Sequence, residues 1–242
     1  MRKKVILLCM VFVLVAAGRS YACVGARPLG MGGAFIGVAD DVTAVYRNPA
    51  GLINCKTIEG HGTITLNRKD QMGYRSFYAY SNGAVGISHI VRQRDNGVLE
   101  NWYVLSGARE IKSAPGLSIG LNFRYEYHSN ENRETQMDIG ALYSKGPWGI
   151  GFMWQSLNNL RLGVSYKVND IIVVSTDIYN TLNNPRIMLG AEIKYKALAF
   201  RAGAYAGDPT IGIGYSSDYM QIDIAAMFRQ DNIILAGITF KY

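Results

Sequence analysis

The chain has 242 residues, of which 49% are hydrophobic and 18% are charged, and its formal net charge is +7. Residues 1–22 hold four basic residues and no acidic one, which leaves 21 basic against 18 acidic residues in the remainder. That excess is small and scattered along the chain, so it does not indicate a nucleic-acid partner.

The first 22 residues have the composition of an export signal. Arg2, Lys3 and Lys4 form a basic start, residues 5–17 are apolar, and Ser20 and Ala22 are small residues at a cleavage position. The apolar run is shorter than the roughly 20 residues of a membrane-spanning helix. We therefore predict a signal peptide over 1–22, with a lipoprotein signal as the alternative because Cys23 follows the cleavage position.

The next segment, residues 23–57, has the features of a compact plug. Glycines at 30, 32, 33 and 37 allow close backbone approach, and the Asp40-Asp41 pair can cap a helix. Val42, Val45 and Tyr46 share one face of a predicted two-turn helix, which Asn48-Pro49 would end. A helix of that length is unstable alone in water, so we expect the segment to pack into the structure that follows.

Cys23 and Cys55 flank this segment, and the exported compartment permits disulfides. A Cys23–Cys55 bridge would close a loop over the whole plug. Two alternatives remain open: both cysteines are free, or Cys23 is lipidated.

From residue 58 onward the hydrophobic pattern has the two-residue period of β-strands. Residues 117–128 are the best case, because Leu117, Ile119 and Leu121 alternate with Ser118, Gly120 and Asn122 and the alternation continues to His128. No segment has the period of a long helix. The sequence therefore predicts an all-β fold over residues 58–242.

Turn residues divide this region into fourteen predicted strands, with twelve as the alternative count. The predicted strands are 58–67, 73–81, 84–92, 99–111, 115–128, 134–144, 148–156, 160–167, 171–179, 185–195, 198–206, 209–216, 219–228 and 232–242. Tight connections such as Asn82-Gly83 and Lys196-Ala197 alternate with longer polar ones such as 68–72 and 129–133. This asymmetry, an even strand count and strands near ten residues are typical of a transmembrane antiparallel β-barrel in an outer membrane.

Charged residues fall on the face of each strand that alternates with the apolar one. In a barrel that face lines the lumen, where charges can pair or contact water. The residues expected there are Arg124, Glu126, Arg161, Lys167, Glu192, Arg201 and Asp223. The last strand ends on Phe240 and Tyr242, which resembles the signal read by barrel-assembly machinery.

The sequence gives no indication of an enzyme or of a cofactor. His61, His89 and His128 lie on separate predicted strands without the spacing of metal ligands, and no nucleophile or zinc-protease motif is present. The glycines near residue 30 do not fit a dinucleotide fingerprint, because Phe35 stands where a glycine is required. We predict that the protein is not an enzyme and holds no metal.

The run from Gly25 to Leu52 resembles the N-terminal signature of the FadL/TodX superfamily of outer-membrane barrels, and most closely its PorV/PorQ-like branch. The matching residues are Gly32-Gly33-Ala34-Phe35, Ala39-Asp40-Asp41 and Asn48-Pro49-Ala50-Gly51-Leu52. Residues 160–228 are similar to the family's C-terminal hairpins. The resemblance implies that residues 30–52 fold back into the barrel as a hatch.

The same resemblance implies two functions. FadL-type members pass hydrophobic compounds across the outer membrane, whereas PorV-like members are partners of a protein-secretion system. The chain departs from the transporters because its outer connections are only a few residues long. We predict passage of hydrophobic or amphipathic small molecules, with a non-conducting secretion accessory or structural barrel as the alternative.

Residues of the hatch signature are the candidate functional site. They are Gly32, Gly33, Phe35, Asp40, Asp41, Tyr46, Arg47, Asn48 and Pro49. Pro49 pushes the backbone of Asn48 away from the helical region, which leaves the Asn48 amide able to bond backbone groups. If Arg47 faces the lumen, we expect it to pair with a carboxylate on the barrel wall, because an unpaired buried charge is costly.

Overall fold

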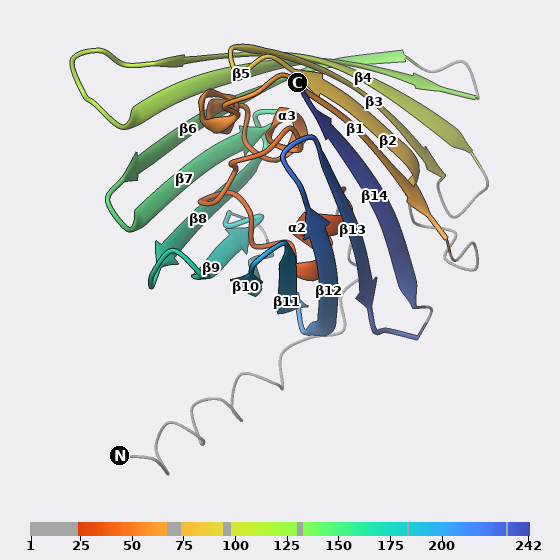
Figure 1. The fold of residues 1–242 in the computed structure, drawn as a ribbon. Helices are drawn as coiled ribbons and strands as arrows, with labels where there is room; N and C mark the ends of the chain where they lie inside the picture. Colours follow the sequence, from red (N-terminus) through yellow and green to blue (C-terminus); the bar gives the residue numbers. More distant parts are fainter. Residues whose placement is uncertain (1–23, 67–73, 94–97, 130–132, 183, 231) are drawn as a thin grey trace.

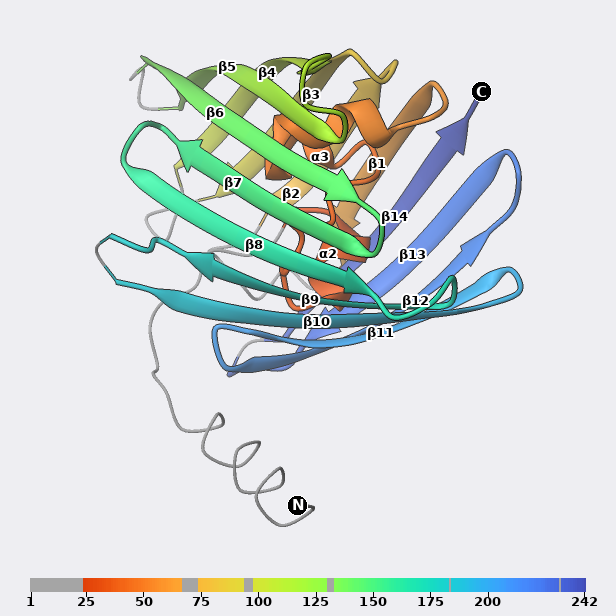
Figure 2. The same cartoon turned by 90° about the vertical axis from the view of Figure 1, so that its left-hand side faces the viewer.

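Fourteen strands form one sheet that closes on itself (Figures 1 and 2). The computed structural model describes residues 24–66, 74–93, 98–129, 133–182, 184–230 and 232–242. The predicted signal peptide lies outside these residues. The strands are β1 (Glu59–Thr65), β2 (Tyr74–Ser81), β3 (Val85–Gln93), β4 (Leu99–Glu110), β5 (Leu117–His128), β6 (Arg133–Lys145), β7 (Trp148–Gln155), β8 (Asn159–Lys167), β9 (Ile172–Tyr179), β10 (Arg186–Tyr195), β11 (Leu198–Tyr205), β12 (Asp208–Ser216), β13 (Met220–Met227) and β14 (Ile233–Lys241).

Every strand pairs antiparallel with its neighbours in the chain, and β1 pairs with β14 to close the barrel. The closing register sets Glu59 opposite Lys241 and Thr65 opposite Leu235. Just beyond it, Ile58 and Tyr242 exchange two backbone hydrogen bonds of 3.2 and 2.9 Å. The prediction of a fourteen-stranded antiparallel barrel is confirmed, and the twelve-stranded alternative is wrong.

The strands are apolar on the outside of the barrel and polar on the inside. In β5, Leu121 and Phe123 are 54% and 56% exposed, while Asn122 and Arg124 between them are 1% and 2% exposed. A water-soluble barrel would show the opposite arrangement. The alternation is the one expected of a barrel with hydrocarbon around it.

The connections at the two ends of the barrel differ less in length than predicted. The end that includes the connections at 82–84, 146–147 and 196–197, called the tight-turn end below, also has a six-residue connection at 111–116. At the other end, the loop end, β11 and β12 are joined by Ala206 and Gly207 alone. Both have positive φ, 52° and 101°, as a two-residue hairpin turn requires.

Residues 24–55, called the insert below, lie inside the barrel, where Figures 1 and 2 show them in orange. The insert contains α2 (Ala26–Gly30), α3 (Ala44–Arg47) and the 3-10 helix η2 (Pro49–Asn54). The predicted two-turn helix is therefore wrong in length, because α3 has four residues. No helix within the described ranges is long and apolar enough to cross a membrane.

Candidate functional site

The insert contacts the barrel wall at distances that leave no room for side chains. A Cβ atom on Gly32 would lie 2.1 Å from the carbonyl oxygen of Leu189 in β10, and the φ of Gly32 is +60°. A Cβ atom on Gly203 in β11 would lie 2.5 Å from the nitrogen of Gly32. Both glycines are therefore required for the two backbones to meet.

A second contact of this kind lies on a neighbouring part of the wall, at β7 and β8. A Cβ atom on Gly149 in β7 would lie 2.2 Å from the carbonyl oxygen of Gly37, and one on Gly163 in β8 would lie 2.7 Å from its nitrogen. The hydroxyl of Ser165 donates a 2.8 Å hydrogen bond to the same Gly37 carbonyl. The insert is thus packed backbone to backbone against β7, β8, β10 and β11.

Arg27 of α2 is the centre of a buried ionic network. Its Nη1 atom lies 2.6 Å from Asp40 Oδ1 and 2.8 Å from Asp41 Oδ2, both within the insert. Its Nε atom lies 3.0 Å from Glu192 Oε2 on the wall strand β10, and Nη2 lies 3.1 Å from Oε1 of the same carboxylate. Arg27 therefore joins the insert to the wall by a two-point ion pair.

The network continues along the wall. Glu192 is fully buried and also accepts a 2.6 Å hydrogen bond from Nε of Arg201 in β11. Nη1 of Arg201 lies 2.8 Å from Asp223 Oδ1 in β13. Because each member has a partner of opposite charge, breaking one contact leaves an unpaired charge in a confined interior, which is costly.

Ionisation of the insert residues follows from this network. Burial alone would raise the pKa of Asp41, but the guanidinium of Arg27 and the bonds from Arg27 and Thr43 hold that pKa below its ordinary value. Burial would lower the pKa of Arg27, and Asp40, Glu192 and Asp41 together raise it well above its ordinary value. The charged forms of both side chains are the stable ones.

Wall side chains also bind the insert backbone directly. Oδ2 of Asp177 in β9 accepts hydrogen bonds from the amides of Phe35 and Ile36, at 2.6 and 2.9 Å. The hydroxyl of Ser175 donates to the carbonyl of Ala34 at 2.8 Å. These bonds supply partners for a stretch of insert backbone that has no sheet or long helix of its own.

Asn48 fixes the turn between α3 and η2, as the sequence predicted for its backbone. It has an extended conformation with φ of −159°, and its side-chain oxygen accepts from the amide of Ala50 at 3.3 Å. Its amide nitrogen donates to the carbonyls of Ile36 and of Ala141 in β6, each at 3.1 Å. Asn48 is fully buried and so joins two parts of the insert to the wall.

Asp41, Arg47 and Tyr46 have further contacts within the insert and with the wall, and the pairing of Arg47 with a wall carboxylate stays a prediction. Asp41 accepts a 2.9 Å bond from the amide of Thr43, but Thr43 has no side-chain cap bond and both acids of the pair bind Arg27. Arg47 donates to the carbonyl of Val24 at 3.1 Å. Tyr46 stacks on Trp102 of β4 with ring centroids 6.2 Å apart.

The predicted lumenal charges are buried inside the wall, with one exception. Arg124, Glu126 and Arg161 lie in the half of the lumen near the loop end, and Arg124 Nε lies 2.8 Å from Glu126 Oε1. Arg161 contacts Gln155 and the hydroxyl of Tyr179. Lys167 is exposed, because it is the last residue of β8 and lies at the barrel rim.

Cys55 is buried where the insert meets β1. Burial, with Glu59, Asp41 and Asp40 nearby, raises the pKa of its thiol, so the thiolate form is suppressed. Cys23 lies outside the described residues. The Cys23–Cys55 bridge therefore stays a prediction.

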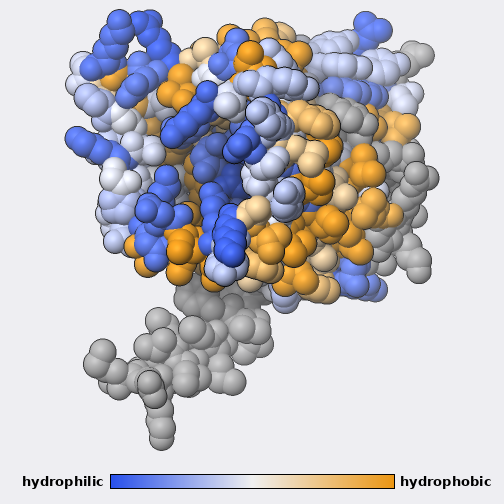
Figure 3. All heavy atoms as spheres, viewed as in Figure 1, coloured by the Kyte–Doolittle hydropathy of each residue, from blue (hydrophilic) through white to orange (hydrophobic). Residues whose placement is uncertain are grey.

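A polar cavity of about 390 Å³ lies over the ionic network. Its lining includes Arg27, Asp40 and Glu192 from the network and Lys194 and Lys241 from nearby strands. In Figure 3, hydrophilic residues gather in the middle of the face and hydrophobic ones cover the strands at lower right. The network therefore lies beneath a polar opening.

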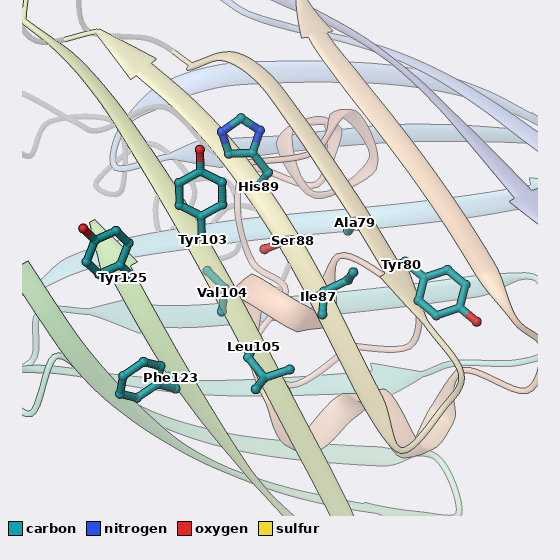
Figure 4. Close-up of a pocket in the computed structure, with 10 residues that line it drawn as sticks. All are labelled: Ala79, Tyr80, Ile87, Ser88, His89, Tyr103, Val104, Leu105, Phe123 and Tyr125. Atoms are coloured by element: carbon teal, nitrogen blue, oxygen red, sulfur yellow. The ribbon is translucent and has the colours of Figure 1, made fainter. Parts of the chain in front are cut away.

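A second depression, of about 540 Å³, lies on the outside of the wall across β2 to β5 (Figure 4). Tyr103, Leu105 and Phe123 are exposed there, and His89 stacks on Tyr103 with centroids 4.7 Å apart. These side chains belong to the apolar exterior. We therefore assign this depression to the outer surface of the barrel and not to the lumen.

Sequence reasoning missed several residues that hold the insert. Arg27, Asp177 and Asn122 were not predicted as site residues, although Asn122 Nδ2 donates to the carbonyl of Val45 at 3.0 Å. Their side chains lie on the inward face of a strand or in a one-turn helix, where polar residues are ordinary. The alternation of polar and apolar residues shows that a polar side chain faces the lumen, but it does not indicate which atom of the insert that side chain binds.

Comparison with known proteins supports the fold. No protein-family model matches the chain, and no curated protein sequence matches it. Among solved structures, the toluene transporter TbuX of Ralstonia pickettii aligns with a TM-score of 0.70 at 13% identity, covering 92% of this chain and 99% of that one.

Two further structures agree. The toluene transporter TodX of Pseudomonas putida has a TM-score of 0.66 at 12% identity, covering 91% of this chain and 98% of that one. A FadL homologue of Pseudomonas aeruginosa has a TM-score of 0.64 at 10% identity, covering 93% and 100%. The resemblance to FadL-type barrels is thus confirmed at the level of the fold.

Proposed function

We propose that this protein is an outer-membrane barrel that passes hydrophobic or amphipathic small molecules, with the insert as its gate. The observation that carries the proposal is the insert itself, which fills the barrel and is held to opposite sides of the wall by close backbone contacts and buried polar bonds. Transporters of toluene share this fold. A filled barrel with a displaceable segment is an arrangement for gated passage.

The location follows from the surface and from the ends of the chain. An exterior of exposed Leu, Ile, Phe and Tyr side chains suits membrane lipid as the surrounding partner. The predicted signal peptide would export the chain, and the terminal Phe240 and Tyr242 would be read by barrel-assembly machinery. We infer residence in the outer membrane of a two-membrane envelope.

Apolar side chains on the insert and wall suit a hydrophobic solute. Leu29, Val42 and Tyr46 of the insert form one buried cluster with Trp102 and Met188 of the wall. Met227, Ile233 and Leu235 near the loop end of β13 and β14 belong to the same cluster. Displacement of the insert would expose this apolar surface to a solute entering from the loop end.

The close contacts between the insert and the wall also support a second function. Gly32 and Gly37 fit the wall so closely that sliding the insert would cause clashes, and the connections at the loop end are short. These features suit a permanently closed barrel that binds other proteins, as PorV/PorQ-like members do in secretion. In that case the insert has a structural role.

The experiment that separates the two is uptake by reconstituted vesicles. The purified protein, the double variant Arg47→Ala/Asn48→Ala and the control Asn158→Ala would be compared for entry of toluene or a hydrophobic dye and for bilayer conductance. Asn158 is an exposed turn residue at the loop end. Gating predicts greater passage in the double variant alone, with the heat-dependent gel shift of a folded barrel unchanged.

The outcome that rejects gating is also defined. If a variant lacking residues 30–52 assembles and stays as closed as the parent, the insert is not a gate. The non-conducting function would then be preferred, and its test is co-purification of secretion proteins with the barrel.

A further inference from the structure

The lysines of the described chain all lie at one end of the barrel. Lysines lie at or just beyond the C-terminal ends of β4, β6, β8, β10 and β14, and one more lies just before β1. They are Lys56, Lys112, Lys145, Lys167, Lys194, Lys196 and Lys241. This is the tight-turn end, where the even-numbered strands stop.

The opposite end has a different cation. Near the loop end the described basic residues are arginines, which include Arg92, Arg133, Arg186 and Arg229. Within the described ranges no lysine lies there. Among the described residues, the two rims therefore differ in the chemistry of their positive groups.

The lysine end has a clear excess of positive charge at its surface. Six of its lysines and Arg109 are exposed, and Lys241 is half-buried. The exposed carboxylates at this end, among described residues, are Glu110, Asp170 and Asp218. Glu110 is also engaged by the backbone amide of Gly116 at 3.0 Å.

A band of outward-facing aromatic residues lies immediately inside this rim. It contains Tyr80, Tyr143, Trp148, Tyr195, Tyr215 and Phe240, each at least 38% exposed and close to a strand end. In membrane barrels such bands lie at the level of the lipid headgroups. Lys145, Lys196 and Lys241 follow Tyr143, Tyr195 and Phe240 by one or two residues, so they then lie among the headgroups themselves.

The lysine and aromatic groups are combined in the β10–β11 turn. The ammonium of Lys196 lies 5.5 Å from the centre of the Tyr195 ring, and Tyr195 is 61% exposed. A lysine at an apolar surface can pack its flexible methylene chain against an aromatic ring and extend its ammonium group toward a layer of phosphates.

We propose that this lysine rim, defined as the lysines named above together with Arg109, binds the phosphate groups of anionic phospholipids in the leaflet at the tight-turn end. The inference rests on the membrane placement in the proposed function but not on passage of a solute. Surface lysines attract anionic lipid through a field that salt screens, so the preference is electrostatic.

The test is competitive lipid binding to the purified, folded barrel. Native mass spectrometry would count retained phosphatidylglycerol and phosphatidylcholine after equal exposure to both. The rim variant is Lys112→Gln, Lys145→Gln, Lys167→Gln and Lys196→Gln combined. These four side chains are exposed and form no hydrogen bond or ion pair with the described residues, so the fold is expected to persist, which the gel shift checks.

The control removes three positive charges from the loop end by Arg133→Gln, Arg186→Gln and Arg229→Gln. The parent and the control should prefer phosphatidylglycerol about tenfold at low salt, and the rim variant should lose most of that preference. High salt should reduce the preference of the parent.

Equal retention of phosphatidylglycerol by the parent and the rim variant would overturn the proposal. So would an equal loss in the loop-end control. A rim variant that keeps its lipid preference but no longer captures an acidic soluble protein would also overturn it and would assign the rim to a protein partner. Solute uptake is measured separately, so failure of the rim and failure of the gate are distinguishable.

Discussion

Arg27 is the residue whose loss should most weaken attachment of the insert. Arg27→Met keeps the length of the side chain but leaves Glu192 and the Asp40-Asp41 pair without that cation. Removing one partner of a buried ion pair costs about 3–5 kcal/mol. We therefore expect the insert to open more often while the barrel stays assembled.

Cys55 can report that opening, because it is buried and its thiol pKa is raised. In a Cys23→Ser background, maleimide should label Cys55 faster in Arg27→Met than in the parent. The control is Lys194→Gln, whose side chain also lies near Glu192 but is 51% exposed. Equal labelling of all three proteins would show that Arg27 does not hold the insert.

Acid should loosen the insert through Asp41. Its pKa is lower in the folded protein than its ordinary value of 3.8, so its contribution to stability is fully present above that value. The contribution is lost as the pH falls toward the depressed pKa. Cys55 labelling, measured at each pH with a thiol reagent that reacts in acid, should rise below about pH 4. Asp41→Asn should show a smaller acid-dependent rise.

The position of the insert in the barrel depends on glycines whose backbone contacts the wall. In Gly32→Ala the new methyl group would lie 2.1 Å from the carbonyl of Leu189, in a backbone conformation that alanine rarely adopts. Overpacking of this kind costs about 1–3 kcal/mol. We expect faster Cys55 labelling and a lower midpoint for the heat-dependent gel shift.

Gly107→Ala is the matched control for that substitution. Gly107 lies in β4, and a Cβ atom there would meet nothing within 4 Å. Its gel-shift midpoint should equal that of the parent. If Gly32→Ala behaves in the same way, the backbone contact between insert and wall is looser than the structure indicates.

The strands were predictable from the sequence, whereas the contacts of the insert were not. The alternation in residues 117–128 indicates which side chains face outward, so the strand and its two faces could be predicted locally. Arg27 and Glu192 are 165 residues apart, and no local sequence pattern around either residue indicates that the two form an ion pair. The helix was predicted too long at its start: α3 ends before Asn48-Pro49 as predicted, but it begins only at Ala44, because residues 41–43 form a turn in which Asp41 binds Arg27 and the amide of Thr43.

For the whole molecule, closure of the sheet is the property to test. Phe240 pairs with both Gly60 and Met220, and Tyr242 bonds Ile58, so residues 240–242 join β14 to both of its neighbours. Deleting them should reduce the fraction of protein that runs as a compact band before heating and that fractionates with the outer membrane. A truncated protein with unchanged yield of the compact band would contradict this.

The order in which the insert meets its partners is fixed by the chain. Its later residues contact β4 to β6, through Asn48 and Val45, while Arg27 and Gly32 need β10 and β11. If the predicted signal peptide exports the chain with its N-terminus first, Arg27, Asp40 and Asp41 emerge long before β10, which holds their wall partner Glu192. Until β10 joins the sheet, these three charges can pair only with one another. Before β14 pairs with β1, the sheet is open and has two unpaired edge strands, which need protection from pairing with other chains.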